Sequence, residues 1–139
     1  MSAARDLIGQ LTSAWGDAAA IAALVAEDAE WWITPTASLP SPMVGKAEIE
    51  ETMQRVFGEI YDPARTRAEV HMTLADGLRA STRITMISHV LLSDRPYRNE
   101  YAIFIETNPA GTKLSRIWEY LDVKHAMDQL GGDPGENQP

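Results

Sequence analysis

Two glutamates and one arginine stand in apolar surroundings in the last third of the sequence. Arg98 and Glu100 open the run R-N-E-Y-A-I-F-I, and Glu119 lies within R-I-W-E-Y-L-D. A buried carboxyl group costs free energy unless it is paired or protonated. Two carboxyl groups in one site, one protonated and one held ionised by an arginine, form a general acid–base pair. Glu119, Glu100 and Arg98 are therefore the candidate catalytic residues.

Whether the two glutamates meet depends on the pairing of the two runs, which flank a Pro/Gly turn and predict a β-hairpin. With the turn centred between them, Glu100 pairs with Tyr120 and Glu119 with Tyr101. A shift of one residue places Glu100 opposite Glu119, with Cβ atoms roughly 5 Å apart. The alternative is structural: Arg98 and Glu100 form a surface ion ladder, and Glu119 is solvated.

The composition narrows the class of function. The 139-residue chain has a net charge of −8, which argues against binding to the phosphate backbone of nucleic acids. It has no cysteine and three scattered histidines, so we expect no disulfide, thiolate nucleophile or metal site. The sequence has no glycine-rich phosphate-binding loop, so this motif gives no reason to expect a bound cofactor. The sequence has neither a membrane span nor a signal peptide, so we expect a cytoplasmic protein that does not enter the membrane.

The hydrophobic spacing predicts helices in the first half of the chain and strands in the second. We expect one domain over residues 1–130 and a disordered tail over 131–139. The fold class is α+β, with helices packed on one face of a curved antiparallel sheet. The predicted helices are 3–15, 18–26, 46–61 and one following Asp122, and the predicted strands are 29–34, 66–74, 78–92 and the two arms of the 97–122 hairpin.

The last strand carries bulky apolar side chains on both faces. Ile117 and Leu121 lie on one face, while Leu114, Trp118 and Tyr120 lie on the other. A strand with two apolar faces is covered twice. Helices account for one cover, and a second copy of the chain accounts for the other. We therefore expect a homodimer through the outer face of the sheet.

Four further residues are candidates for substrate binding. His71 and His89 lie on predicted strands and are candidates for a base in the pocket, with a structural role, which is commoner for an isolated histidine on a strand, as the alternative. Trp31 is one of two consecutive tryptophans, of which one must point inward and line either the core or a pocket. Tyr101 offers a phenolic hydrogen bond to a substrate oxygen, with core packing as the alternative.

Three stretches resemble the SnoaL-like branch of the nuclear transport factor 2-like (ketosteroid isomerase-like) superfamily. They are W-G-D-A-A-A-I-A-A-L-V-A-E-D-A-E-W at 15–31, V-G-K-A-E-I-E-E-T-M at 44–53, and the 99–122 hairpin. The resemblance implies a cone-shaped curved antiparallel sheet wrapped on N-terminal helices, an apolar pocket between helices and sheet, and a dimer. It specifies the fold far better than the reaction, because this fold carries many activities.

The resemblance also bears on individual residues. Arg98 and Glu100 resemble the Arg-x-Asp of limonene-epoxide hydrolases, and Glu119 resembles the acid of their last strand, with glutamate replacing aspartate both times. SnoaL-type polyketide cyclases place a catalytic acid near that last-strand position. The general base of ketosteroid isomerases corresponds to Thr34 here, and their first-helix tyrosine has no match at the end of that helix, which reads Ala14-Trp15. Steroid isomerisation is therefore not expected.

The sequence thus predicts a small, cofactor-independent enzyme that uses pocket carboxylates for proton transfer on an apolar, oxygenated small molecule. The reaction type is isomerase, lyase or cyclase. One alternative is an epoxide hydrolase of the limonene-epoxide hydrolase type. The other is a dimeric ligand-binding module without catalysis.

Overall fold

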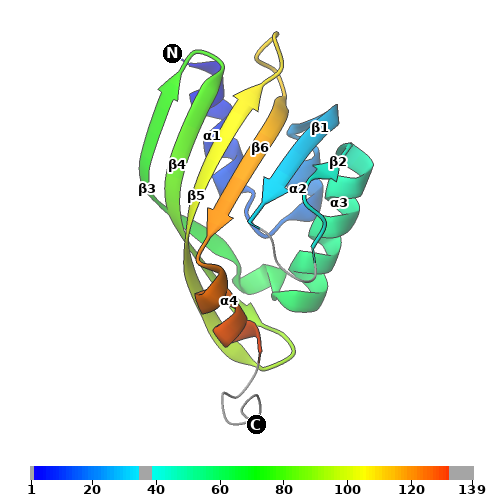
Figure 1. The fold of residues 1–139 in the computed structure, drawn as a ribbon, viewed down its shortest axis with the longest axis vertical. Coiled ribbons are helices and arrows are strands. Elements are labelled where there is room, and N and C mark those ends of the chain that lie inside the picture. The colour runs from blue at the N-terminus through cyan, green and yellow to red at the C-terminus, as the bar shows by residue number, and fades with distance from the viewer. Residues whose placement is uncertain (1, 35–38, 132–139) are drawn as a thin grey trace.

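A six-stranded curved sheet with helices on one face forms the frame of the protein (Figure 1). The computed structural model describes residues 2–34 and 39–131. The elements are α1 (Ala3–Ser13), α2 (Ala18–Ala22), β1 (Val25–Ile33), β2 (Met43–Val44), α3 (Lys46–Arg55), a π-helical turn (Val56–Ile60), a 3-10 turn (Pro63–Arg65), β3 (Arg67–Asp76), β4 (Arg79–Val90), β5 (Arg95–Thr107), β6 (Leu114–Leu121) and α4 (Val123–Leu130). The predicted α+β class is confirmed. The predicted disordered tail, apart from Gly131, lies outside the described residues.

The strands are ordered β2-β1-β6-β5-β4-β3, and the sheet does not close into a barrel. All neighbours are antiparallel except β1 and β6, which run parallel. This pair departs from the expected antiparallel sheet. It arises because the chain leaves β1, passes through α3 and the β3–β5 meander, and comes to lie beside β1 again only with β6. The pairing brings Trp31, on β1, beside the Ile117–Glu119 segment of β6.

The first helix begins with Ser2, whose side chain accepts a hydrogen bond from the Arg5 N–H, and it buries Leu7, Ile8 and Leu11. The turn after it requires glycine. Gly16 has φ +100°, and a Cβ atom there would lie 2.8 Å from the Cβ atom of Thr66. The chain therefore turns sharply just beyond Trp15, which is buried at 6% exposure.

Two predicted boundaries are wrong for identifiable reasons. The strand β1 begins at Val25 rather than 29, because its N-terminal part already lies beside Leu114 at the start of β6. The predicted helix 46–61 is regular only to Arg55, and a π-helical turn follows in which Phe57 has the non-helical angles φ −97° and ψ 52°. This turn buries both Val56 and Phe57 and directs them toward the space between the helices and the sheet.

Within residues 2–34 and 39–131, no helix has both the length and the apolar character needed to span a membrane.

Candidate active site

Glu119 is a buried carboxyl group on the inner face of the sheet. It sits on β6, where its backbone neighbours are Ile33 on β1 and Ile103 on β5, and the residue is only 5% exposed. The indole Nε1–H of Trp31 donates to its Oε1 atom over 2.9 Å. Trp31 itself is fully buried, so the two side chains hold one another in a fixed position.

Burial raises the pKa of Glu119 from its ordinary value of 4.5 to about 7, and the Trp31 hydrogen bond opposes that rise. The cause is loss of hydration, which penalises the charged form. No lysine, arginine or histidine lies among the described residues that line its cavity. A pKa raised toward neutrality suits Glu119 to act as either acid or base.

A narrow, apolar cavity of about 60 Å³ reaches Glu119 between the sheet, the π-helical turn and α4. Its polar side chains are few, and the rest of the wall is aliphatic or aromatic. The described residues that line it are Trp15, Ile33, Leu39, Met43, Thr52, Met53, Val56, Phe57, Ile60, Tyr61, Met86, Tyr101, Glu119, Leu121, Ala126, Met127 and Leu130. Leu39 and Met43 come from the segment that leads into β2, and residues 35–38 lie outside the described part of the chain.

A hydrogen-bonded chain of side chains leads to this cavity from β5. The Asn99 Nδ2–H donates to the Tyr97 hydroxyl over 3.1 Å, and the hydroxyls of Tyr97 and Tyr101 lie 2.8 Å apart. Tyr61 packs edge-on against Tyr97 and shares the cavity wall with Tyr101. Burial, then the nearby Tyr61, Tyr97 and Glu119 groups, raise the pKa of Tyr101 well above its ordinary range. Tyr101 thus remains a neutral hydroxyl that can donate or accept.

Trp15 is a cavity residue that the sequence pattern does not single out. Its ring packs edge-on against Tyr101 and Phe57 and is tilted against Trp31. Its buried indole N–H has no hydrogen-bond partner among the described residues. In the sequence, Trp15 continues the buried stripe of Leu7 and Leu11 at helical spacing, so only the structure distinguishes it from a core residue.

The structure does not bring Glu100 and Arg98 to Glu119, so the expected acid–base pair of the two glutamates does not form. Tyr101 pairs with Leu121 and Ile103 with Glu119, a register that differs from both alternatives considered above. A bulge between Glu106 and Thr107 produces it and turns Glu100 to the opposite face of the sheet from Glu119.

On the outer face, Glu100 and Arg98 make exposed ion pairs. Glu100 pairs with Arg83 over 3.2 Å, and Arg98 with Glu69 over 3.6 Å. The Glu100 side chain is 68% exposed. This is the surface ladder considered as the structural alternative, although Glu100 and Arg98 bond to other partners rather than to each other.

The two histidines also lie away from the cavity. His71 Nε2 is 2.6 Å from the Thr85 hydroxyl, and His89 Nε2 is 2.6 Å from an Asp94 carboxylate oxygen. Neither ring lines the Glu119 cavity. Of the four expected substrate-binding residues, Tyr101 lines the cavity, and Trp31 contacts Glu119, which lines it.

In the described part of the chain, no group of three or more acidic or histidine side chains could hold a metal ion.

Thr34 has a structural task at the end of β1. Its backbone N–H donates to the Glu119 carbonyl over 3.0 Å, and its hydroxyl accepts from the Leu121 N–H over 3.3 Å. These bonds fix the backbone of β6 on both sides of the Glu119 side chain. Thr34 therefore positions the Glu119 carboxyl group and does not itself serve as the acid or base.

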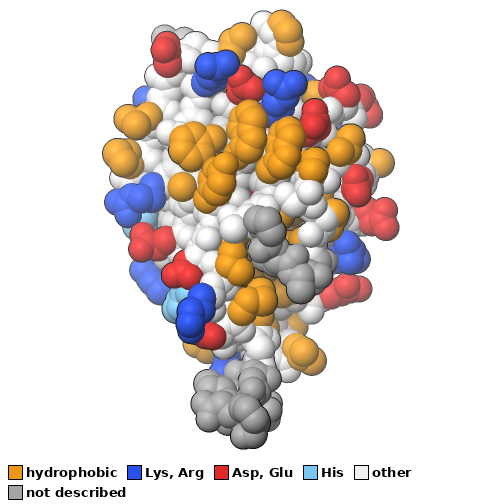
Figure 2. Space-filling model, in the orientation of Figure 1, with side chains coloured by type: hydrophobic (Ala, Val, Ile, Leu, Met, Phe, Trp, Pro, Cys, Tyr) orange, Lys and Arg blue, Asp and Glu red, His pale blue; other side chains and the backbone are white. Residues whose placement is uncertain are grey.

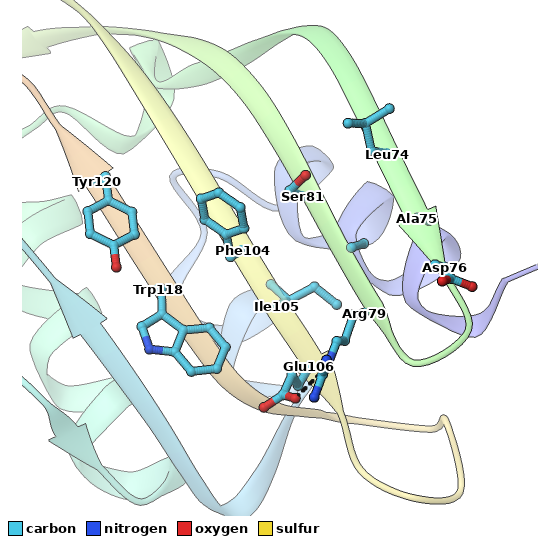
Figure 3. A pocket seen from close by; sticks show the side chains of 11 residues that line it. Leu74, Ala75, Asp76, Arg79, Ser81, Phe104, Ile105, Glu106, Trp118 and Tyr120 are labelled. Atoms are coloured by element: carbon cyan, nitrogen blue, oxygen red, sulfur yellow. Dashed lines mark hydrogen bonds and ion pairs between the residues drawn. The ribbon is translucent and has the colours of Figure 1, made fainter.

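A wider hollow of about 660 Å³ lies on the outer face, along Phe104, Trp118 and Tyr120 (Figure 3). Its wall contains Arg79 and Glu106, which are already joined by a 2.8 Å ion pair. This hollow is open to solvent, whereas the smaller cavity is enclosed and ends at the buried carboxyl group of Glu119. We therefore place the candidate active site at the smaller, enclosed cavity.

Solved structures of the same fold come from several bacteria. A nuclear transport factor 2-like protein of unknown function from Burkholderia pseudomallei K96243 superimposes with a TM-score of 0.80 at 15% identity, covering 94% of this chain and 98% of that one. A candidate polyketide cyclase from Pseudomonas putida KT2440 gives 0.71 at 24% identity, with coverage of 94% and 98%. A phenazine biosynthesis-related protein from Pseudomonas aeruginosa gives 0.76 at 15% identity, with coverage of 94% and 86%. At these identities the likeness shows the fold alone.

A comparison with curated proteins finds no match. The model of the SnoaL-like domain family, in contrast, matches residues 11–117, which include most of the cavity wall and end two residues before Glu119. The resemblance noted in the sequence is thereby confirmed, and the chain belongs to the SnoaL-like domain family.

Proposed function

We propose that this protein is a small, cofactor-independent enzyme in which Glu119 transfers a proton on an apolar, oxygen-bearing small molecule. One observation carries the proposal: the buried carboxyl group of Glu119 ends an apolar cavity whose described residues include no cation, and burial raises its pKa to about 7. A structural carboxylate would be paired with a cation or exposed, as Glu100 is. A carboxyl group poised near the working pH is suited to general acid–base catalysis.

The walls of the cavity define the substrate. Aliphatic and aromatic side chains require an apolar molecule, and the tyrosine hydroxyls offer hydrogen bonds to an oxygen. The volume of about 60 Å³ is smaller than the roughly 150 Å³ cavity that holds benzene. A ring-sized substrate therefore requires the walls to move apart. An isomerase, lyase or cyclase step fits a lone acid–base residue, and the fold neighbours include a candidate polyketide cyclase.

The epoxide hydrolase alternative loses its support because it needs a second carboxylate and an arginine in the cavity. Arg98 and Glu100 both lie on the outer face. The ligand-binding module without catalysis is then the competing outcome of the test below.

The test compares Glu119→Gln with a matched control, Glu100→Gln, which makes the same chemical change on the opposite face. Small cyclic ketones would be incubated in D₂O with each protein, and deuterium incorporation followed by proton NMR. We expect wild type and Glu100→Gln to agree within about twofold and Glu119→Gln to lose roughly 10²- to 10⁴-fold. Equal rates for all three proteins, or no exchange with wild type, would contradict the proposal and favour a binding module.

We further propose that the outer face of the sheet pairs with a second copy of the chain. A row of side chains crosses five strands there, formed by Leu74, Ser81, Phe104, Trp118 and Trp32. Phe104 is 47% exposed and Tyr120 beside it 51%, so the patch meets solvent in the monomer (Figure 2). The face turned away from α1 carries these rings together (Figure 3).

Charge favours a second copy as the occupant of this face. The chain carries a net charge of −8, which opposes self-association in general. The apolar row, however, is bordered by both signs of charge. The ion pairs at its borders are Arg79–Glu106, Arg116–Glu106, Arg83–Glu100 and Arg98–Glu69. A two-fold axis brings such a patch onto itself, and mixed charges at the border make that contact self-complementary.

The test is the molar mass in solution, measured by light scattering after size exclusion. Wild type should elute at twice the 15.3 kDa of the chain, and Phe104→Glu should elute as the monomer. Leu92→Glu, which changes a 90% exposed leucine in the turn after β4, is the control and should remain dimeric. A monomeric wild type, or a dimeric Phe104→Glu, would contradict this arrangement.

A further inference from the structure

The indole N–H of Trp15 is a buried donor without a partner among the described residues. The side chain is 6% exposed and forms part of the cavity wall. A buried N–H that makes no hydrogen bond costs about 1 to 3 kcal/mol. The neighbouring indole of Trp31, by contrast, is satisfied by Glu119 over 2.9 Å. Of the two indoles in this aromatic cluster, one holds the carboxyl group and the other has no hydrogen-bond partner among the described residues.

The hydroxyl chain adds a second polar group at the same cavity. The Asn99 amide is fixed in orientation because its Oδ1 accepts from the Glu100 N–H over 2.9 Å and its Nδ2 donates to the Asp122 carbonyl over 3.0 Å. Its Nδ2–H also donates to the Tyr97 oxygen. The hydroxyls of Tyr97 and Tyr101 lie 2.8 Å apart, and either can donate to the other, so Tyr101 presents a hydrogen-bonded hydroxyl at the cavity wall.

We propose that Trp15 determines the ligand class of this cavity, and that the ligand is a small, apolar carbonyl compound whose oxygen accepts a hydrogen bond from the Trp15 indole. The inference rests on the proposed active site for its location. A carbonyl oxygen is a neutral acceptor without a proton of its own, and it matches a wall that offers donors. It also acidifies the adjacent C–H, which is the proton that Glu119 would take.

The charge of the cavity disfavours an anionic acceptor. A carboxylate ligand would place a second negative charge beside Glu119, and no described cavity residue carries a positive charge to offset it. A hydrocarbon of the same shape would leave the Trp15 N–H unsatisfied. Discrimination between a carbonyl and its hydrocarbon isostere is therefore the property that this arrangement predicts.

The test titrates ¹⁵N-labelled wild type with cyclopentanone and with its isostere methylenecyclopentane, and follows the indole N–H signals of the four tryptophans. We expect the ketone to shift the Trp15 signal, and the alkene to bind at least tenfold more weakly with little effect on it. The Trp32 and Trp118 rings, stacked 5.5 Å apart, are not among the residues lining the cavity, so their signals serve as internal controls. Equal affinity for both probes, a Trp15 signal unmoved by the ketone, or failure of both probes to bind would overturn the inference.

Variants separate this inference from the proposed function. Trp15→Phe should lose the preference for the ketone about tenfold while binding the alkene as wild type does, and Trp118→Phe should change neither affinity. Glu119→Gln should still bind the ketone and shift the Trp15 signal. If that variant binds the ketone but wild type shows no proton exchange, the carbonyl site stands and the catalytic proposal fails. If proton exchange is intact but the ketone is not preferred, the catalytic proposal stands and the carbonyl site fails.

Discussion

The two faces of the β5–β6 hairpin hold one glutamate each and treat them in opposite ways. On the inner face, Glu119 is 5% exposed, accepts a hydrogen bond from the Trp31 indole and meets an apolar cavity. On the outer face, the Glu100 side chain is 68% exposed and paired with Arg83. The residue type is the same and the strands are neighbours, so the difference lies in hydration and in the available counter-charge.

Hydration explains why only one of the two glutamates is a candidate catalyst. Water and an arginine stabilise a carboxylate on the outer face, and an exposed pair of this kind contributes about 0 to 1 kcal/mol. Glu119 is removed from water, and no cation lies among the described residues of its cavity, so its pKa rises from 4.5 to about 7. That change makes ionisation of Glu119 less favourable by roughly 3 kcal/mol than ionisation of a hydrated glutamate.

The largest expected difference between the two glutamates is in how each makes the free energy of unfolding depend on pH. Between pH 4.5 and about 7 the folded protein holds a proton on Glu119 that the unfolded chain has released. The contribution of Glu119 to the free energy of unfolding is therefore fully present below pH 4.5 and is lost as the pH rises through 7. Relative to Glu119→Gln, wild type should lose roughly 3 kcal/mol between acidic and mildly alkaline pH.

Urea unfolding at a series of pH values measures this difference. Glu100→Gln is the matched control, and its difference from wild type should not show this fall through neutral pH. A difference between wild type and Glu119→Gln that stays constant with pH would mean that the two faces treat their glutamates alike.

A smaller effect is expected from Trp31→Phe, which keeps an aromatic ring but removes the N–H that reaches Glu119. That hydrogen bond lowers the pKa of Glu119, so its loss should raise the pKa further above 7. At alkaline pH the folded protein should lose about 2 kcal/mol of stability, because the carboxylate is left without its donor. Trp32→Phe, on the outer side of the same strand, is the control. An unchanged pKa in Trp31→Phe would show that this bond does not tune Glu119.

The smallest effect is expected on the outer face. Removal of the Arg83–Glu100 pair by Arg83→Gln should change the free energy of unfolding by less than about 1 kcal/mol, and less still at high salt, because both side chains are more than half exposed. Denaturant titration at low and high ionic strength provides the measurement. A loss of several kcal/mol would place Glu100 in the same energetic class as Glu119.

The sequence predicts the elements better than it predicts their register. The Pro/Gly turn and the alternating runs indicate the hairpin, and the helical spacing of Leu7, Leu11 and Trp15 indicates α1. The bulge between Glu106 and Thr107 has no comparable signal, yet it decides which face Glu100 takes. A shift of one residue reverses every side chain of a strand, so local pattern alone could not establish the pairing of the acids.

In the candidate site too, local sequence patterns predict some residues, and others become visible only in the tertiary structure. Glu119 stands out in sequence because a charge interrupts an aromatic strand. The sequence also predicts Tyr101 and Trp31 near a substrate. Tyr101 lies at the cavity wall, and Trp31 contacts the acid Glu119. Trp15 and Tyr61 carry no such signal, since their part in the cavity depends on the glycine turn after α1 and on the π-helical turn after α3. Both turns are tertiary features that helical periodicity does not report.

The central claim is that burial holds Glu119 near neutrality, and a titration of its side-chain carboxyl carbon by ¹³C NMR tests it most directly. The signal is assigned by its absence in Glu119→Gln, and the Glu100 signal in the same spectra serves as the exposed reference. The account predicts a midpoint for Glu119 of about 7. A midpoint near the ordinary value of 4.5 would contradict it, because an acid ionised at that pH is neither desolvated nor poised to exchange a proton near neutrality.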